Sequence, residues 1–421
     1  MSKQAFALVY IGTPGDVELE LSNLIEKFSY EETIDKDNHL EVQLKSDYSL
    51  ELLESTALKT GKPICFQFGF IGEQLSEVKI MAITDIDAEY SSRVTLKIIA
   101  SDQAVTLKKA KGKEVYNDAT ASDIAKQIAA KYGLKVVVTP TTRIYNGLVQ
   151  GKKNDFQVLK MLAAEEPGYV SYVTNSTVYF VKRGLSDTST ILLTMGQEGV
   201  ISFTPKWQES ATDGDANSTS AVGVDPSNKK IIDVLAGNDS KGDVNLGTVS
   251  TEIVNSGVDV IGYVGSTFKS DSNGGSGGTV SGITSVEEAK AKASAKQSDA
   301  KIKLLVANLV TIGNPLMKID TIITIGNVAR MHQGNWYVTG IRHDIAGSSY
   351  LNNINLAKNA VSRKDLGKEV VNGAVNTSIG ADEITNSKSI DSYVVVDGGV
   401  SKINQGSKEV VDKFRTDRVK K

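Results

Sequence analysis

GKPICFQFGF at residues 61–70 opens a series of segments that decides the fold, because a similar series occurs again near the end of the chain. The first series continues with VKIMAITDID at 78–87 and RVTLKIIASD at 93–102. The second consists of GNPLMKIDTIITIG at 313–326, NWYVTGIRHD at 335–344 and YLNNINLAKN at 350–359. A Gly-x-Pro turn opens each series, at Gly61 and at Gly313, and the second has the longer loop, around Asn327 to Gln333. Two similar β units in one chain indicate a protein that presents one surface twice, as an adaptor between assemblies of different symmetry needs to do.

Both series alternate between core-facing and polar positions, which predicts strands with one buried face. The alternating positions are Ile64, Phe66, Phe68 and Phe70 in the first series, and Ile319, Thr321, Ile323 and Ile325 in the second. The first β region runs from Met1 to about Leu107 and the second from about Leu304 to Ala360. Such strands, packed antiparallel, predict a small barrel or sandwich.

The composition predicts a multidomain globular protein made in a reducing compartment. The chain has 421 residues, and its 40% of hydrophobic residues are enough for real cores. A net charge of −3 argues against a dedicated binder of nucleic acid or of anionic membranes. The single cysteine, Cys65, lies in an alternating strand pattern and is predicted to be a buried core thiol. The sequence therefore offers no disulfide framework and no cysteine-based zinc site.

The sequence also predicts no membrane-spanning segment and no export signal. A transmembrane helix needs about 18 consecutive apolar residues, and no such run occurs. AFALVYIG at 5–12 is followed by Pro14, Gly15 and Asp16 without a small-residue cleavage site. We therefore expect a strand here rather than a signal peptide, and a soluble protein.

The periodicity becomes helical between residues 108 and 184. Thr120 is predicted to cap a helix that ends at Gly133. Asn154 and Gln157 form a capping box at the start of a second helix. The segment is therefore predicted to be a compact α/β domain.

A hairpin, a polar insertion and a further helix are predicted next. YVSYV and TVYFVKR flank Asn175-Ser176, which indicates a hairpin with a polar turn. Ser, Gly, Asn, Asp and Thr predominate from about Gln208 to Thr284, which indicates a mobile insertion. Ser285 and Glu288 then form a capping box for a helix. A short terminal helix is predicted from Ser407 to Lys421.

The motifs that resemble nucleophile or phosphate sites are better explained by turns and linkers. Ser276 lies in NGGSGG, which lacks the strand–turn–helix context of a nucleophile elbow. GLVQGKK at 147–153 has three residues between its glycines where a phosphate loop has four. Lys153 also stands where Ser or Thr must bind magnesium. We expect this segment to be a turn that leads to the Asn154 helix.

The histidines do not predict a metal or catalytic site. His39, His332 and His343 lack the helical or turn spacing of metal ligands. His343 and Asp344 are adjacent, and adjacent residues on a strand point to opposite faces. His343 is therefore expected to make a structural hydrogen bond rather than to act as a base.

The charged clusters do not predict a functional site either. Glu165-Glu166 and Glu287-Glu288 lie at helix termini or in a first turn, whereas glycosidase carboxylates face each other across a cleft. A basic run without interleaved aromatic residues is interpreted as a solvated loop; its members are Lys108, Lys109, Lys111 and Lys113. The sequence predicts no catalytic, cofactor-binding or metal-binding residue, no cofactor and no nucleic-acid site. It leaves the partner-binding residues unknown.

An ordered set of motifs resembles a known family. The order is a Lys-rich strand, a Thr-led helix that ends in Gly-Leu, and a Gln and an Asp before a Phe-x-x-Leu helix. The corresponding residues are Thr120, Gly133-Leu134, Gln150, Asp155, Phe156 and Leu159. With these motifs, residues 108–183 resemble the middle of the phage late control D family, the hub proteins of contractile phage tails and related injection machines. FSYEETIDKDNHLEVQL at 28–44 resembles the family's opening, and SVEEAKAKASAKQ at 285–297 with the second series, including His343, resembles its closing part.

The resemblance implies an α+β, mostly β, structural protein with two tube-protein-like antiparallel β-barrel domains. The first barrel domain is predicted at 1–107, the α/β middle domain at 108–184, the second barrel domain at 185–207 and 285–360, the flexible Gly/Ser/Asn/Asp-rich insertion at 208–284, and a polar extension at 361–421. Hubs of this family form trimers, in which two tube-like domains per chain match a sixfold tube on one side and a threefold spike on the other. The internal duplication agrees with that arrangement.

The predicted function is that of a trimeric baseplate hub in a virion or phage-tail-like particle, synthesised in the bacterial host cytoplasm. The implied partners are a spike protein, the tail tube and its initiator proteins, and other baseplate components. No β-helix repeats occur in the sequence, so the spike is expected to be a separate chain. Two alternatives stay open, namely the hub of a non-contractile tail and a cell-wall hydrolase delivered by the particle. A neighbouring sheath gene would distinguish the first, and clearing of peptidoglycan the second.

Overall fold

The structure is a computed structural model of the 421-residue chain. It describes residues 4–45, 49–92, 94–109, 112, 114–145, 147–184, 191–197, 199–207, 220–224, 231–235, 246, 291, 292, 295, 299, 302, 303, 305–329, 332–359, 370, 371, 374, 375, 392–396 and 399–403. Within these ranges strands predominate, and three hydrophobic cores form.

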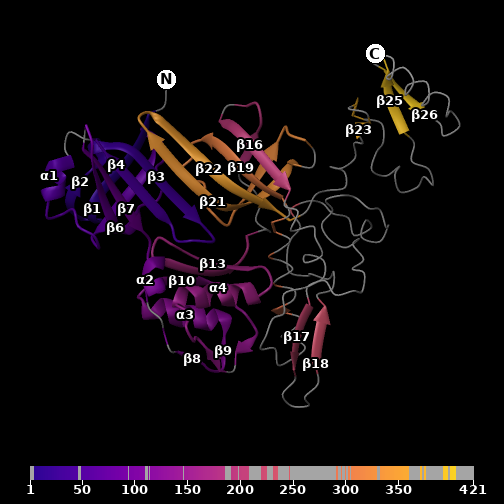
Figure 1. The fold of residues 1–421 in the computed structure, drawn as a ribbon, viewed down its shortest axis with the longest axis horizontal. Helices are drawn as coiled ribbons and strands as arrows, with labels where there is room; N and C mark the ends of the chain where they lie inside the picture. Colours follow the sequence, from indigo (N-terminus) through magenta and orange to yellow (C-terminus); the bar gives the residue numbers. More distant parts are fainter. Residues whose placement is uncertain are drawn as a thin grey trace.

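Thirteen of the described strands belong to one large sheet across the upper part of Figure 1. Its N-terminal strands are β1 (Ala5–Thr13), β2 (Asp16–Glu20), β3 (Ile25–Thr33), β4 (His39–Leu44), β5 (Pro63–Phe70), β6 (Lys79–Tyr90) and β7 (Val94–Ser101). Its C-terminal strands are β15 (Ile191–Thr194), β16 (Val200–Trp207), β19 (Leu305–Ile312), β20 (Ile322–Gly326), β21 (Gly334–Ala346) and β22 (Ser349–Lys358). The short helices η1 (Ser22–Leu24) and α1 (Ser49–Glu54) accompany the first group.

The strand order makes one sheet from the two halves of the chain. In the described residues it is β16-β19-β22-β21-β3-β4-β7-β6-β5-β1-β2, with β20 beside β21 and β15 beside β20. The pairs are antiparallel except β15 with β20. A mostly β protein with a large antiparallel sheet is therefore confirmed, whereas closure into two barrels stays a prediction.

The buried face of the sheet packs on two hydrophobic cores that meet where β3 lies beside β21. The first core draws on β1 and β3 to β7, and also includes Ile345 of β21 and Tyr350 of β22. The second core draws on β19 to β22, and also includes Ile34, just after β3. Because each core takes residues from the other half of the chain, burial and strand pairing stabilise the same junction.

The two sequence series form equivalent three-stranded meanders, β5-β6-β7 and β20-β21-β22. The long middle strands β6 and β21 each carry a bulge, at Thr84 and at Thr339. Two residues before each bulge, Ala82 and Tyr337 pair with both neighbouring strands. The duplication predicted from the sequence is therefore present in the strand register.

The alignment of the opening turns by their Gly-x-Pro motifs is wrong. Before the first meander, the Gly61 amide donates to the carbonyl of Ile83 at 2.7 Å. Before the second, the Asp320 amide donates to the carbonyl of Val338 at 3.0 Å. Gly61 and Asp320 both have positive φ, at 85° and 57°. Asp320 is thus the counterpart of Gly61, because an aspartate also tolerates the left-handed conformation, and Gly313 lies upstream of the equivalent turn.

The structural repeat is longer than the repeat visible in the sequence. β3 and β4 extend the first meander in the same order in which β16 and β19 extend the second. Both outer strands have a bulge at the same place, at Glu26 in β3 and at Ile201 in β16. We call β3-β4-β5-β6-β7 and β16-β19-β20-β21-β22 the first and second repeat.

The α/β unit lies below the sheet in Figure 1. Its helices are α2 (Ala104–Lys109), α3 (Ala121–Lys131) and α4 (Asp155–Glu165), and its three-stranded sheet has β10 (Lys135–Val138), β14 (Thr177–Lys182) and β13 (Tyr169–Thr174). A small ribbon pairs β8 (Val115–Tyr116) with β12 (Leu148–Val149), and β9 (Ala119–Thr120) with β11 (Ile144–Tyr145). The helices and strands enclose the third hydrophobic core.

The helix ends and the turn of this unit follow the sequence predictions. Thr120 caps α3, and Gly133 after that helix has a φ of 64°. Asn154 and Gln157 form the expected capping box of α4. Asn175-Ser176 forms the hairpin turn, with both φ values positive. The side chains of Thr120 and Asn154 each accept a hydrogen bond from an amide group that the start of a helix leaves without an internal partner.

Gln150 and Asp155, which carry part of the family resemblance, form a buried polar cluster. The Gln150 amide donates to the Asp155 carboxylate at 2.7 Å, and Lys131 lies 3.0 Å from that carboxylate. The Tyr132 hydroxyl donates to the same group at 2.5 Å. These bonds hold the turn before α4 against the end of α3, so the two motif residues have a structural role.

The basic run begins inside a helix, which corrects the predicted loop and Lys-rich strand at this point. Lys108 and Lys109 are the last residues of α2. Leu107 beside them is fully buried in the core of the α/β unit, so α2 spans the predicted boundary at 107/108. The other two lysines of the run lie outside the described residues.

Several predicted segments are described in part. In the predicted insertion the structure describes a ribbon of β17 (Ser220–Val224) and β18 (Ile231–Leu235). Beyond residue 360 it describes β23 (Val370–Val371), β24 (Ala374–Val375), β25 (Ser392–Val396) and β26 (Gly399–Ile403). Ser276, the Ser285 capping box, Glu287-Glu288 and the predicted helix at 407–421 lie outside the described residues. The division into domains stays a prediction.

Gly313 is predicted to be required for the packing of Tyr350 rather than for a turn. A Cβ at this position would lie 2.1 Å from the Tyr350 ring, whereas a Cβ at Gly326 would lie 3.6 Å from its nearest neighbour, the Thr194 Oγ1. Gly313→Ala should lower the free energy of unfolding by about 1–3 kcal/mol through overpacking. The matched control, Gly326→Ala, should change it by less than about 1 kcal/mol. Equal effects in urea unfolding would contradict the close approach.

Candidate assembly interface

The pairing of β3 with β21 joins the two repeats, and we call it the internal seam. Its register runs from Gly340 opposite Thr33 to Ala346 opposite Lys27. β21 changes partner at the Thr339 bulge, since its first half pairs with β20 and its second half with β3. The seam therefore uses an edge that the meander itself leaves open.

The α/β unit braces the end of the internal seam through its β13-β14 hairpin (Figure 1). Asn38, which follows β3, donates its side-chain amide to the carbonyl of Val173 at 3.1 Å. Asn175, in the hairpin turn, donates to the carbonyl of Val78 at 3.2 Å. The hairpin thus contacts both the β3 end and the start of β6.

Glu32 is a buried carboxylate at the end of β3, with an exposed fraction of 4%. It accepts hydrogen bonds from the Thr174 hydroxyl and from the Lys79 ammonium, the latter at 3.1 Å. Burial acts to raise the pKa of Glu32, but Lys79 and Thr174 outweigh it and the pKa is lowered. The carboxylate therefore stays ionised and links β3, β6 and the α/β unit.

His343 occupies the middle of the internal seam and is 1% exposed. Its Nδ1 lies 2.8 Å from the Tyr350 hydroxyl, and its ring packs 4.5 Å from the Phe68 ring centroid. Burial lowers the pKa of His343 to about 3, so the ring is neutral at ordinary pH. The expected structural hydrogen bond is confirmed. Asp344 next to it is half-buried and hydrogen-bonds Arg342.

Asp320 links the second repeat to the α/β unit. Its carboxylate accepts hydrogen bonds from the hydroxyl of Tyr337 at 2.7 Å and from that of Tyr172 at 3.3 Å. The Gly184 amide donates to it at 3.0 Å. One side chain thereby joins β21, β13 and the end of the α/β unit. The same residue also forms the turn before the second meander, where it is the counterpart of Gly61.

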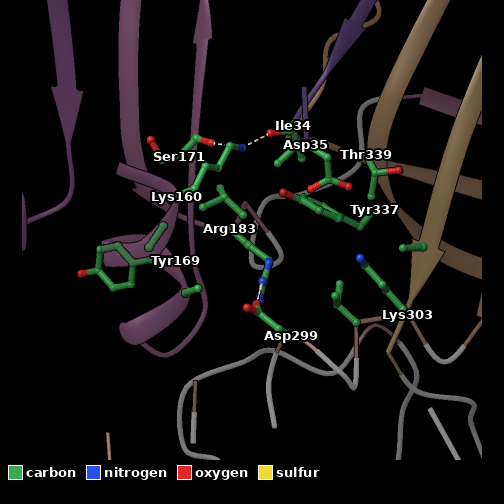
Figure 2. A pocket seen from close by; sticks show the side chains of 15 residues that line it. Ile34, Asp35, Lys160, Tyr169, Ser171, Arg183, Asp299, Lys303, Tyr337 and Thr339 are labelled. Carbon is green, nitrogen blue, oxygen red and sulfur yellow. Dashed lines mark hydrogen bonds and ion pairs between the residues drawn. The ribbon is translucent and has the colours of Figure 1, made fainter. Parts of the chain in front are cut away.

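A pocket of about 210 Å³ lies between the α/β unit and the second repeat (Figure 2). Lys160 of α4 donates to the backbone carbonyls of Ile34 and Ser171. Burial lowers the pKa of this lysine to about 8. Arg183 forms an ion pair with Asp299 across the pocket. Lys160 and Arg183 are thus both occupied by protein partners. The pocket therefore holds contacts between the units rather than a preformed ligand site.

The two kinds of edge that meet in the internal seam occur again without a strand partner in the described part of the chain. Residues 85–90 of β6 correspond to 340–345 of β21, but they pair with β7 alone. β16 corresponds to β3 and is the end strand of the sheet. We call these the β6 edge and the β16 edge.

The core-facing residues of the β6 edge are less buried than their counterparts at the internal seam. Three residues of β21 are exposed by 5% or less: Ile341, His343 and Ile345. Their counterparts on β6 are Ile86, Ala88 and Tyr90. Ile86 and Ala88 are half-buried, and Tyr90 is 68% exposed. The β6 edge thus presents apolar surface at the positions that a neighbouring strand covers in the internal seam.

The residues whose chemistry could serve catalysis are spread over the structure. Glu165 hydrogen-bonds Tyr145 at 3.1 Å and lies 3.3 Å from Arg143. Burial raises the pKa of Glu166, at the end of α4, to about 7. Cys65 is buried, as expected, and GLVQGKK forms β12 and the turn before α4. Within the described residues no group of three or more His, Cys, Asp or Glu side chains is placed to hold a metal ion.

His39 and His332 do not form a cluster with His343. His39 begins β4, and His332 lies in the loop before β21, where its carbonyl accepts the indole N–H of Trp336 at 2.8 Å. Sequence reasoning missed the β6 edge and the β16 edge because an edge is defined by strand order rather than by residue type. The alternation in VKIMAITDID predicts the strand but not the partner that it lacks.

The chain has the fold of phage tail proteins. The tail protein from Neisseria meningitidis MC58 matches it with a TM-score of 0.60 at 11% identity, covering 85% of this chain and 98% of that one. The 43 kDa tail protein of prophage MuSo2 from Shewanella oneidensis matches with a TM-score of 0.57 at 12% identity, covering 85% of this chain and 99% of that one. The resemblance to tail proteins stated from the sequence is thus confirmed at the level of the fold.

The family model described as the Alg8 N-terminal domain matches residues 43–347. This match spans more than half of the chain, which therefore belongs to that family. No curated protein matches the sequence. Among the described residues, no helix has the length and apolar character needed to span a membrane.

Lys79→Met should expose the cost of burying Glu32. At pH 7 the variant should lose about 3 kcal/mol of unfolding free energy, because it leaves an ionised carboxylate buried without its partner. In the wild type the pKa of Glu32 is lowered, so its contribution is present above the ordinary carboxylate pKa and is lost as pH falls through the folded value. In the variant burial dominates and raises that pKa, so protonation at low pH relieves the cost.

The loss caused by Lys79→Met should therefore shrink between pH 7 and pH 4, as measured by urea unfolding. A matched control is Lys126→Met, which removes the exposed pair with Asp123 on α3. That variant should change stability by less than about 1 kcal/mol at either pH. A pH-independent loss in Lys79→Met would show that the ion pair does not stabilise the β3 end.

Proposed function

We propose that this chain is the structural hub of the baseplate in a contractile phage tail or a phage-tail-like injection system. In this role three copies form a ring that joins a threefold spike to a sixfold tail tube and nucleates tube assembly. The fold shared with phage tail proteins supports the proposal. The two repeats with equivalent register support the adaptor role, because one chain then offers two similar docking surfaces.

The observation that carries the proposal is the complementarity of the β6 edge and the β16 edge. The β6 edge repeats the geometry of β21, and the β16 edge repeats that of β3. The β6 edge of one copy can therefore pair with the β16 edge of the next, as β21 pairs with β3 inside the chain. Pro205 in β16 lacks an N–H, so this pairing has at most one donor fewer.

Pairing of these edges would cover the apolar positions that the single chain leaves open. Tyr90 on the β6 edge is 68% exposed, and Phe203 on the β16 edge is half-buried, whereas its counterpart Phe28 is 1% exposed. A contact between two different edges is head-to-tail, and such a contact closes a ring or extends a filament. The number three comes from the family resemblance, and three chains with two repeats each give a ring that alternates first and second repeats.

The two predicted tube-like barrel domains belong to this proposal. Residues 1–107 would carry the first, and 185–207 with 285–360 the second, while the α/β unit at 108–184 braces the internal seam. The sixfold tail tube and its initiator proteins would bind the ring on one side, and the separate spike on the other. The protein would reside in the virion or particle after synthesis in the host cytoplasm.

The proposed role is non-catalytic. The groups with the strongest candidacy for chemistry already have structural partners, since Glu165 binds Tyr145 and Arg143 and His343 binds Tyr350. The fold shared with structural tail proteins agrees with this. No observation favours a hydrolase over a hub, and the geometry of the repeats fits contractile and non-contractile tails alike.

Ala88→Lys should prevent assembly without unfolding the chain. Ala88 is half-buried on the β6 edge, at the position that His343 fills in the internal seam, so a charged side chain there would keep contact with water in the single chain and lose it on pairing. Electron microscopy of the purified wild-type chain should show threefold rings with a nearly sixfold rim and a central channel. The variant should give particles of single-chain mass.

Thr95→Lys is the matched control, because Thr95 lies on β7 at a half-buried position outside the pairing edge. It should form the same rings as the wild type. Wild-type chains that remain monomeric, alone and when co-expressed with a candidate spike protein, would overturn the hub proposal. Clearing of peptidoglycan by the purified chain would favour the hydrolase instead.

A further inference from the structure

The equivalent registers place opposite charges at corresponding positions with their signs exchanged. In the internal seam Arg342 of β21 lies directly opposite Glu31 of β3. On β6 the residue that corresponds to Arg342 is Asp87, because each stands two places beyond the first pair after the bulge. On β16 the residue that corresponds to Glu31 is Lys206.

The counterpart of Glu31 is defined by the strands that flank it. Tyr30 and Glu31 pair with consecutive residues of β4, as Pro205 and Lys206 pair with consecutive residues of β19. Glu31 and Lys206 each lie five residues after the bulge of their strand, at Glu26 and Ile201. The correspondence therefore does not depend on sequence similarity. A pairing of β6 with β16 in the register of the internal seam therefore sets Asp87 opposite Lys206.

The surroundings of these positions favour a role for charge. Arg342 donates from Nε to the Ser29 hydroxyl and to the Asp344 carboxylate, both at 2.9 Å, so this face of the seam is polar. The β6 edge carries three exposed carboxylates on that face: Asp85, Asp87 and Glu89. Lys206 is exposed and is the sole charged residue of β16.

We propose that Asp87 and Lys206 form a charge pair between neighbouring copies of this chain that selects which strand edges pair. The proposal rests on the proposed ring and names the residues that set its order. A pairing of β6 with β3 of another copy would place Asp87 opposite Glu31, and a pairing of β21 with β16 would place Arg342 opposite Lys206. Like charges directly opposite each other destabilise a strand pair.

The exchanged signs thus disfavour the two swapped pairings that the shared backbone geometry allows. This matters because the strands of both seams have the same bulges, so hydrogen bonding alone does not distinguish them. The exchanged signs direct a first repeat to a second repeat at each contact, through Arg342 and Glu31 within a chain and through Asp87 and Lys206 between chains. A second copy of this chain is the partner that the β6 edge and the β16 edge recognise.

Charge-reversal variants test the pair in the full-length chain. Asp87→Lys and Lys206→Asp should each raise the concentration at which rings dissociate by about tenfold or more, because each ring contains three copies of the contact. The double variant D87K/K206D should return it to within about threefold of the wild-type value. Mass photometry over a dilution series measures the change, and circular dichroism confirms that each variant is folded.

Lys152→Asp is the matched control for charge, since Lys152 is exposed in the turn before α4, and it should leave dissociation unchanged. Rings that dissociate equally in the wild type and both single variants would overturn the charge pair and leave the hub proposal standing. Single variants that weaken the ring without rescue in D87K/K206D would also overturn it. A wild-type chain that forms no rings would overturn both proposals.

Discussion

The backbone ladder between β3 and β21 is the constraint on which the rest of the structure depends. It turns two copies of one strand pattern into a single sheet, and both large cores take residues from each side of it. The ladder exists because β21 changes partner at the Thr339 bulge and frees an edge for β3. The α/β unit, Glu32 and Asp320 then hold the ends of the same junction. In the proposed hub, both docking edges would therefore belong to one continuous sheet.

The buried polar groups at the internal seam have protonation states and partners that offset the free-energy cost of their burial. His343 is neutral and bound to Tyr350, while Glu32 stays ionised because Lys79 and Thr174 satisfy its charge. Removing one partner from such a group costs more free energy than the pair contributes. A substitution that keeps the strands but breaks one of these contacts leaves a buried polar group unpaired. These contacts therefore favour this particular pairing of β3 with β21.

Local signals predicted local structure well. The caps at Thr120 and Asn154, the Asn175-Ser176 turn and the buried Cys65 follow from short-range chemistry and occur as expected. Strand partners and edges depend on register across hundreds of residues, which alternation does not encode. The Gly-x-Pro pattern misaligned the repeat because Asp320 adopts the conformation of Gly61 with another side chain. β16 went unrecognised as the counterpart of β3 because a long segment separates it from β19.

The connection between β16 and β19 has a consequence for how the chain can vary. In the first repeat the equivalent link is the short one from Thr33 to His39, which the α/β unit contacts. In the second repeat the link runs from Trp207 to Leu305, yet the register of the strands that it joins is unchanged. Closing a longer loop costs little more free energy than closing a short one. This link can therefore gain whole segments away from Leu246 and Ile302, which pack in the second core, and a foreign domain inserted there would leave the sheet intact.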